Sequence, residues 1–180
     1  KKQTLPFRGE YFMIKPVFKY LVKGLIYPVP NPSLPFLGVH FTKMINGNIE
    51  AGPNAVLALA REGYNWRTIN FEELYESLSY TGLQRFILKY PLTTANEVMR
   101  SLSKTIFINS LQKMIPDIRS HMLVPGIAGV RAQLMNIKGD LEQDFDIRIN
   151  GNIVSILNAP SPAATSSLSI SEYIVDLLTK

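Results

Sequence analysis

The segment LGVHFTKMINGNIEA, residues 37–51, carries the clearest strand pattern in this chain of 180 residues. In its first half every second residue is apolar, and successive side chains of a strand point to opposite faces. The apolar side chains therefore share one face, while His40 and Thr42 share the other. The pattern predicts a strand whose polar pair points away from its apolar face.

Turn signals extend this strand into a hairpin. Asn46-Gly47 predicts a type I′ turn that joins it to a strand at residues 48–51. Asn150-Gly151 predicts a second turn of the same type, between strands at residues 145–149 and 152–157. Both turns favour antiparallel pairing of neighbouring strands.

Three further strands are expected, at residues 7–14, 25–29 and 127–134. The first contains Gly9. A glycine inside a strand indicates a bulge or the close approach of another backbone or a ligand.

The middle of the chain is expected to be helical. Three pairs have the spacing of a capping box, in which the first side chain accepts from a free backbone N–H and the second reaches back to the cap. These pairs are Asn70 with Glu73, Thr81 with Gln84, and Thr94 with Glu97.

Two further helices follow from periodicity and capping. An apolar stripe from Val98 to Met114 predicts one helix that ends before Pro116, and its role is packing rather than cofactor binding. A last helix is expected to run to about Leu178, with Ser161 as its N-cap and Pro162 at its first position.

The order of these elements predicts the fold class. Strands, then helices, then strands, without alternating βαβ units, are typical of an α+β domain with an antiparallel or mixed sheet and a helical middle section. We divide the chain into residues 1–125, which contain the central helices, and residues 126–180, which contain strands and the C-terminal helix. Charged residues make up 18% of the chain, against about 25% in an average soluble domain. We therefore expect a face that a missing partner domain or subunit covers.

The composition excludes several classes of function. The chain has no cysteine and two histidines, which argues against a thiolate nucleophile and against a metal site. Its net charge of +5 comes from lysines and arginines scattered singly, so no nucleic-acid partner is expected. Prolines or serines interrupt the two long uncharged stretches, residues 24–42 and 150–171, so no transmembrane segment is expected.

The first residues and the pattern of glycines indicate how this chain relates to a longer protein and to dinucleotide binding. The start of the chain lacks both an initiator methionine and the apolar region of a signal peptide, so we expect a piece cut from a longer protein. The glycines never form the G-x-G-x-x-G fingerprint of a dinucleotide-binding unit.

Four features suggest chemistry, and each has a purely structural alternative. Arg131 lies on a predicted strand beside a glycine and suits bidentate recognition of a carboxylate, or is a surface arginine. His40 beside Thr42 suits a general base with a hydroxyl neighbour, or is a half-buried histidine with its hydrogen bonds made. The helix start expected at Ser161 suits an anion, or is an ordinary N-cap. Tyr27 offers a phenol to a ligand, or packs as an aromatic.

Seven motifs together resemble one family. In order along the chain they are PFRGEY (6–11), YPVP (27–30), GVHFT (38–42), GPNAVLA (52–58), AREGY (60–64), GVRAQ (129–133) and NAPSPAAT (158–165). They are similar to the L-2-hydroxyglutarate oxidase/dehydrogenase group of the FAD-dependent D-amino-acid oxidase superfamily. The resemblance runs from about Pro6 to Leu178.

The resemblance implies a two-domain flavoenzyme. Its N-terminal Rossmann part, absent from this chain, binds the ADP end of FAD, and its substrate domain lies over the isoalloxazine. This chain resembles the substrate domain together with the C-terminal segment that faces the flavin.

The resemblance also implies roles for single residues. Arg131 matches the arginine that holds the substrate carboxylate, and Thr42 and Tyr27 are placed at the substrate. A hydroxy acid loses its O–H proton as hydride leaves, so a base is expected, and His40 is the candidate catalytic residue. The residues expected to face the flavin are Asn158, Ala159, Pro160, Ser161, Pro162, Ala163, Ala164 and Thr165.

The function implied is oxidation of an L-2-hydroxy acid, L-2-hydroxyglutarate, to the 2-oxo acid, with FAD as cofactor. The partners implied are a small 2-hydroxy dicarboxylate and the missing FAD domain, without which this chain is expected to be inactive. Two alternatives stay open: an FAD-dependent amino-acid or amine oxidase, and a non-catalytic module that binds an anion or a protein. The expected location is the cytoplasm, with peripheral attachment at the inner membrane as the alternative, and the electron acceptor is left open among oxygen, a quinone and a carrier protein.

Overall fold

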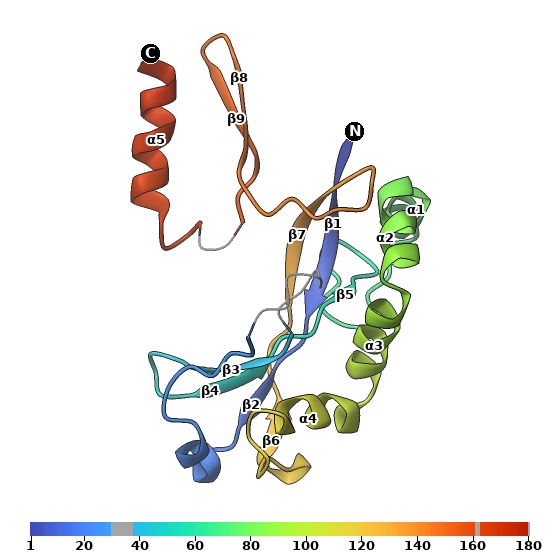
Figure 1. Cartoon of the computed structure of the whole chain (residues 1–180), viewed down its shortest axis with the longest axis vertical. Helices are drawn as coiled ribbons and strands as arrows, with labels where there is room; N and C mark the ends of the chain where they lie inside the picture. Colours follow the sequence, from blue (N-terminus) through green and yellow to red (C-terminus); the bar gives the residue numbers. More distant parts are fainter. Residues whose placement is uncertain (30–37, 161–162, 180) are drawn as a thin grey trace.

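The computed structural model describes residues 1–29, 38–160 and 163–179, and the strand pairs in that part of the chain are antiparallel (Figure 1). The strands form three separate sheets, and helices occupy the middle and the end of the chain. The predicted α+β class is confirmed.

The first sheet places the start of the chain beside a strand from its last third. Its order is β5–β1–β7, with bounds Val56–Leu57, Lys2–Gly9 and Gly129–Asn136. β1 and β7 pair along their whole length. A Cβ added to Gly9 would lie 2.7 Å from the Cβ of Pro53, so this glycine permits the close approach of another segment.

The second sheet has the order β3–β4–β2–β6, with bounds His40–Lys43, Ile49–Gly52, Phe12–Ile14 and Leu123–Pro125. The strand predicted at residues 7–14 is therefore split, because β1 ends at Gly9 and β2 begins at Phe12. The strand predicted at residues 25–29 is reduced to one bridge between Ile26 and Phe41.

The predicted hairpin between β3 and β4 is confirmed, but its predicted type I′ turn is wrong. The N–H of Met44 donates to the carbonyl of Asn48 at 2.8 Å, so the loop has three residues. Gly47 has φ +75°, whereas Asn46 does not adopt a positive φ. A type I′ turn needs positive φ at both central residues, and a three-residue loop with a left-handed glycine does not.

The third sheet is the hairpin of β8 and β9, Asp146–Asn150 and Ile153–Asn158. Asn150 pairs with Ile153, so the connecting residues are Gly151 and Asn152. Gly151 has φ +57°, and neither neighbouring asparagine adopts a positive φ. The type I′ turn centred on Asn150-Gly151 is therefore also wrong, although the hairpin itself is present.

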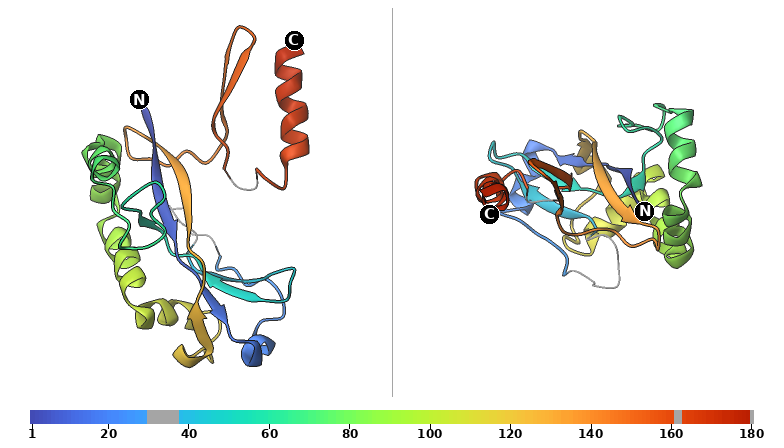
Figure 2. Two further views of the ribbon diagram at one scale, coloured as in Figure 1. Left: turned by 180° about the vertical axis from the view of Figure 1, so that it is seen from behind. Right: turned by 90° about the horizontal axis from the view of Figure 1, so that it is seen from above.

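Helices α1 to α4 follow one another along one side of the first two sheets (Figure 2). No helix in the described ranges is long and apolar enough to cross a lipid bilayer. The helices are η1 Pro16–Leu21, α1 Phe71–Ser79, α2 Thr81–Lys89, α3 Pro91–Leu102, α4 Lys104–Gln112, η2 Ser120–Met122 and α5 Ser167–Thr179.

Of the three helix N-caps predicted from capping-box spacing, one is present in the structure and two are not. Asn70 caps α1 as predicted, by accepting from the N–H groups of Glu72 and Glu73. The reciprocal bond of the capping box is absent, because the Asn70 N–H donates to Leu59 and the Glu73 carboxylate accepts from the N–H of Arg61. Thr81 is instead the first residue of α2, whose N-cap residue, Tyr80, makes no side-chain capping bond, and Thr94 lies inside α3. The helix predicted from Val98 to Met114 is broken at Ser103, which caps α4.

The last helix also begins later than predicted. α5 starts at Ser167, so the predicted first turn at residues 163–166 is not helical. Ser161 and Pro162, the predicted N-cap and first residue, lie outside the described residues. The delayed start moves the free N–H groups of the helix away from the segment in which they were expected.

Two clusters of buried apolar side chains stabilise the body of the molecule. The first packs the second sheet against α4 and includes Ile14, Phe41, Phe107 and Leu111. The second packs the first sheet against α2 and includes Leu5, Phe7, Leu83, Phe86 and Met135.

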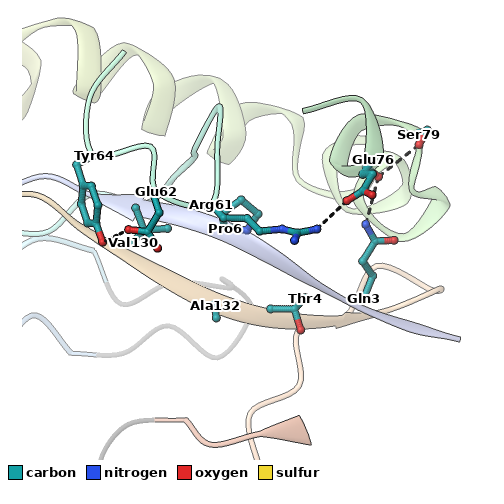
Figure 3. A pocket seen from close by; sticks show the side chains of 10 residues that line it. All are labelled: Gln3, Thr4, Pro6, Arg61, Glu62, Tyr64, Glu76, Ser79, Val130 and Ala132. Atoms are coloured by element: carbon teal, nitrogen blue, oxygen red, sulfur yellow. Dashed lines mark hydrogen bonds and ion pairs between the residues drawn. The ribbon is translucent and has the colours of Figure 1, made fainter. Parts of the chain in front are cut away.

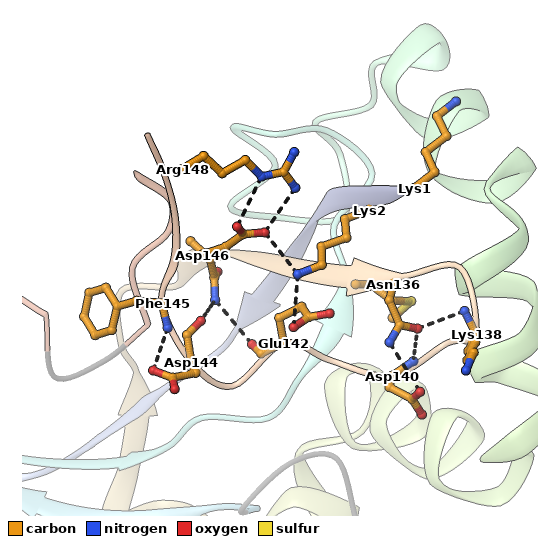
Figure 4. Close-up of polar contacts among 12 residues, drawn as sticks. Lys1, Lys2, Asn136, Lys138, Asp140, Glu142, Asp144, Phe145, Asp146 and Arg148 are labelled. Atoms are coloured by element: carbon orange, nitrogen blue, oxygen red, sulfur yellow. Dashed lines mark hydrogen bonds and ion pairs between the residues drawn. The ribbon is translucent and has the colours of Figure 1, made fainter. Parts of the chain in front are cut away.

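Polar contacts join the β8–β9 hairpin to the start of the chain (Figure 4). The Nζ of Lys2 lies 3.0 Å from a carboxylate oxygen of Asp146 and 3.4 Å from one of Glu142. Arg148 bonds the same Asp146 carboxylate, and the amide of Asn158 donates to the carbonyl of Asp144 at 2.7 Å. The hairpin and α5 extend beyond the N-terminal end of β1 (Figures 1 and 2).

Candidate active site

His40 is positioned by the apolar face of its own strand. Phe41 is fully buried in the first cluster, so the alternation of β3 turns His40 and Thr42 to the opposite face. Both of those side chains are half-buried.

Tyr27 is brought to this pair by a backbone bridge. Ile26 and Phe41 exchange backbone hydrogen bonds of 3.0 and 2.9 Å. The ring of Tyr27 then stacks on His40 with centroids 4.2 Å apart and planes 19° apart. Its hydroxyl lies 3.5 Å from Thr42 Oγ1, so the three candidate residues are neighbours.

Arg131 reaches the same place from the first sheet. It lies on β7 opposite Phe7 of β1, and its side chain makes no hydrogen bond or ion pair with another residue in the described ranges. A cavity of about 90 Å³ lies between the two sheets, and its lining residues are Gly38, His40, Pro53, Asn54, Ala55, Glu97 and Arg131. A water molecule occupies about 30 Å³ in the liquid, so the cavity has room for a carboxylate-sized group.

The electrostatics of the cavity favour a neutral imidazole. Burial lowers the pKa of His40 below its usual 6.5; the backbone of Gly38 opposes that shift, and the Arg131 cation adds to it. His40 Nδ1 is buried and has no hydrogen-bond partner among the described residues. The imidazole therefore has a free ring nitrogen beside a cation.

Tyr11 is a neighbour that the sequence analysis did not single out. Burial raises the pKa of its phenol above 10.0, and the Arg131 cation opposes that rise. The only signal in the sequence was its place in the PFRGEY motif.

A buried polar network holds the wall of the cavity at residues 53–55. Asn54 is 1% exposed; its Oδ1 accepts from the N–H of Glu10 at 2.7 Å, and its amide donates to the Glu10 carboxylate at 2.9 Å. Arg8, fully buried, forms an ion pair of 3.0 Å with the same carboxylate. Gly52 has φ +146°, and a Cβ there would lie 2.7 Å from the Glu10 carbonyl oxygen, so the turn into this wall requires glycine.

Glu97 holds the same wall from α3. Its carboxylate accepts from the N–H of Ala55 at 2.8 Å and pairs with Arg100 on its other oxygen. The sequence analysis assigned Glu97 to a capping box with Thr94, and that role is wrong because both residues lie inside α3. The spacing of Glu97 and Arg100 was the one local signal of its pairing.

The segment expected to face a flavin lies apart from this cavity. None of its described residues lines the cavity with His40 and Arg131. Asn158 is buried, and its side-chain amide donates to the backbone carbonyls of Glu142 and Asp144. The backbone N–H of Ala163 donates to the carbonyl of Pro160. The cofactor role of this segment stays a prediction.

A larger hollow of about 790 Å³ lies on the other face of β1 and β7 (Figure 3). Its charged groups already have partners, since Arg61 lies 2.8 Å from Glu76 and Tyr64 donates to Glu62 at 2.7 Å. It contains neither His40 nor Arg131. The smaller cavity is the better candidate because its arginine has no hydrogen-bond or ion-pair partner among the described residues.

The arrangement of potential metal-ligating side chains also bears on whether the described residues form a metal site. No cluster of three or more His, Asp or Glu side chains in the described part of the chain has the arrangement of a metal site.

The fold and the cavity together define an α+β domain suited to hold a small carboxylate beside an imidazole. No protein-family model matches the chain. It is 54% identical over 178 residues to an L-2-hydroxyglutarate dehydrogenase of Indibacter alkaliphilus, a match that covers 99% of this chain and 45% of that protein.

Other relatives carry the same name. The mitochondrial L-2-hydroxyglutarate dehydrogenase of Nematostella vectensis is 45% identical, covering 97% of this chain and 39% of that protein. The L-2-hydroxyglutarate dehydrogenase of Escherichia coli K12 is 43% identical, covering 94% and 40%. The chain is therefore a homologue of L-2-hydroxyglutarate dehydrogenases over nearly all of its length, which confirms the resemblance. It spans less than half the length of these curated relatives.

Proposed function

We propose that this chain is the substrate-binding part of an oxidoreductase that converts L-2-hydroxyglutarate to the 2-oxo acid. The observation that carries the proposal is the shared cavity of His40 and Arg131 in a chain that is 43–54% identical to proteins named L-2-hydroxyglutarate dehydrogenase. The proposed boundary of this part lies at residues 125 and 126, with residues 126–180 facing the cofactor. β1 and β7 pair across that boundary.

Arg131 binds the carboxylate next to the reacting carbon in this proposal. The planar guanidinium, which has no partner in the described part of the chain, can donate two parallel hydrogen bonds to one carboxylate. The cavity holds a group of that size and leaves the rest of the substrate outside it.

His40 accepts the proton of the substrate hydroxyl. Oxidation removes a hydride from C2 and a proton from the oxygen, so the carbon–oxygen bond becomes a carbonyl. Because burial lowers the pKa of His40, the imidazole is neutral at pH 7 and able to take that proton. Tyr27 fixes the ring by stacking, and Thr42 lies within reach of the Tyr27 hydroxyl.

FAD is the proposed cofactor and, when bound, it accepts the hydride. The proposal rests on the resemblance to an FAD-dependent group, with residues 158–165 facing the flavin. The relatives are more than twice as long as this chain, and the additional length is proposed to include the FAD domain. This chain alone is expected to be inactive.

Exposed apolar residues near the C-terminus support a covering partner. Ile153, Ile156, Tyr173, Val175 and Leu178 are each more than 40% exposed. Large apolar side chains that are exposed in one region are typical of a surface that another domain covers. Cytoplasmic placement, with peripheral attachment at the inner membrane as the alternative, belongs to the same proposal and is tested by cell fractionation.

The direct test is the visible spectrum of the full-length protein before and after addition of L-2-hydroxyglutarate. We expect a flavin spectrum that the substrate bleaches, with formation of the 2-oxo acid. Ammonia release from an amino acid would favour the amino-acid or amine oxidase. A colourless protein that FAD does not reconstitute would favour the non-catalytic module that binds an anion or a protein.

Variants test the two roles separately. Arg131→Gln is expected to raise KM by about 10- to 100-fold, the loss expected for charged hydrogen bonds, and Arg67→Gln, an exposed arginine elsewhere, serves as control. His40→Gln is expected to lower kcat by about 100-fold or more, with the exposed His121→Gln as control. Unchanged kinetics in both site variants would remove the site assignment.

A further inference from the structure

We propose that a second cavity, between the first sheet and helices α1 to α3, binds a small aromatic molecule that carries one hydroxyl group. The cavity has a volume of about 330 Å³ and is separate from the cavity of His40 and Arg131. The proposed function makes no use of it.

The lining selects an apolar, ring-shaped ligand. Leucine, isoleucine and valine side chains from three helices and from residues 56–59 make up about half of the lining residues, and Phe7, Trp66 and Phe86 add aromatic rings. The rings of Phe7 and Phe86 meet edge to face at 6.3 Å. Aromatic ligands gain from offset or edge contacts with such rings.

The volume sets the size of the ligand. An apolar cavity of about 150 Å³ binds benzene, and this cavity is about twice as large. Two fused rings are therefore the matching size, at the lower end of the range for small-molecule pockets.

Two polar side chains in the wall require a hydroxyl on that ligand. Thr94 lines the cavity, and its Oγ1 is buried with no hydrogen-bond partner in the described ranges. Glu97, 7% exposed, lines it as well, and a carboxylate with one partner on each oxygen still has accepting capacity. A hydroxyl group both donates and accepts, so it satisfies both side chains at once.

Glu97 and Ala55 line both cavities. A ligand in the apolar cavity therefore contacts the same carboxylate that fixes the wall beside Arg131.

The experiment measures binding of 2-naphthol and of naphthalene to the full-length protein by ligand-observed NMR. We expect saturable binding of both, with 2-naphthol about 3- to 10-fold tighter because of its hydroxyl. Thr94→Val keeps the shape of the side chain and removes its hydroxyl, and it is expected to reduce the preference for 2-naphthol. Naphthalene binding should change little in that variant.

A matched pair of variants locates the site. Val98→Trp, on the wall of the cavity, is expected to abolish binding of both compounds. Leu92→Trp, on the same helix but 79% exposed and outside the cavity, should leave binding unchanged. No saturable binding, equal affinities for the two compounds, or equal behaviour of the two tryptophan variants would overturn the proposal. Binding is measured without turnover, so its outcome is independent of the proposed dehydrogenase activity.

Discussion

The described residues of 1–141 contain two clusters of buried apolar side chains, whereas those of 146–179 contain none. In the first region such residues as Leu5, Phe41 and Phe107 are at most 1% exposed. In the second, Ile153 is 65% and Leu168 is 83% exposed, and Asn158 is its one described side chain that counts as buried. Both regions have regular secondary structure, so the apolar pattern alone does not decide burial.

The contacts between the two regions explain the difference. An ion pair between Lys2 of the first region and Asp146 of the hairpin joins the two regions near the surface. Such pairs contribute little to stability because water and salt screen them. The second region therefore needs a surface that the first does not supply, and the longer relatives have the length to supply it.

The largest expected effect comes from truncating the core of the first region. In the 180-residue chain, Phe107→Ala is expected to lower the free energy of unfolding by about 3–5 kcal/mol, because Phe107 is 1% exposed. Leu168→Ala is expected to change it by less than about 0.5 kcal/mol. Urea unfolding followed by circular dichroism measures both.

The same pair of variants in the full-length protein sharpens the comparison. If a partner domain covers α5, Leu168→Ala should cost more stability there than in the 180-residue chain. Equal costs in both proteins would contradict the covering surface.

An intermediate effect is expected in backbone hydrogen exchange. Amides of β8, β9 and α5 should exchange faster than those of β1 and β7 in the 180-residue chain, since few buried apolar contacts protect them. In the full-length protein the exchange of the second region should slow. Exchange rates that match across both regions of the 180-residue chain would break the comparison.

The smallest expected effect is the change in stability with pH that results from protonation of His40 in the first region. The pKa of His40 is lowered by burial, so the unfolded chain binds a proton on His40 more readily than the folded chain does. The contribution of His40 to stability is then fully present above pH 6.5 and is lost as pH falls below that value. NMR titration of the two histidines, assigned with His121→Gln, should show the lowered pKa.

A stability measurement checks the same sign. Acidification from pH 7.5 to 5.5 should destabilise the wild-type chain more than His40→Gln. A larger loss in the variant would reverse the sign.

Local patterns predicted the secondary structure better than its boundaries. The alternation around His40 fixed a strand and its buried face, and Asn70 fixed the start of α1. The turn at Asn46-Gly47 was predicted wrongly because the register of β3 and β4 makes the loop one residue longer. Ser103 breaks a continuous apolar stripe, which periodicity alone does not show.

The site could be predicted in parts but not as a whole. His40, Thr42, Tyr27 and Arg131 were each singled out from local spacing and the family motifs. Their meeting depends on the Ile26–Phe41 bridge and on the pairing of β1 with β7, which join distant parts of the sequence. Glu97 was missed because its partner, the N–H of Ala55, lies 42 residues away.

The pairing of Lys2 with Asn136 also has a consequence for synthesis. β1 is made before its partner β7, which leaves the ribosome only after more than a hundred further residues have been added. At about 5–20 residues per second, the unpaired edge of β1 waits on the order of ten seconds. During that interval the edge of β1 that later pairs with β7 is open to chaperones and to pairing with other chains.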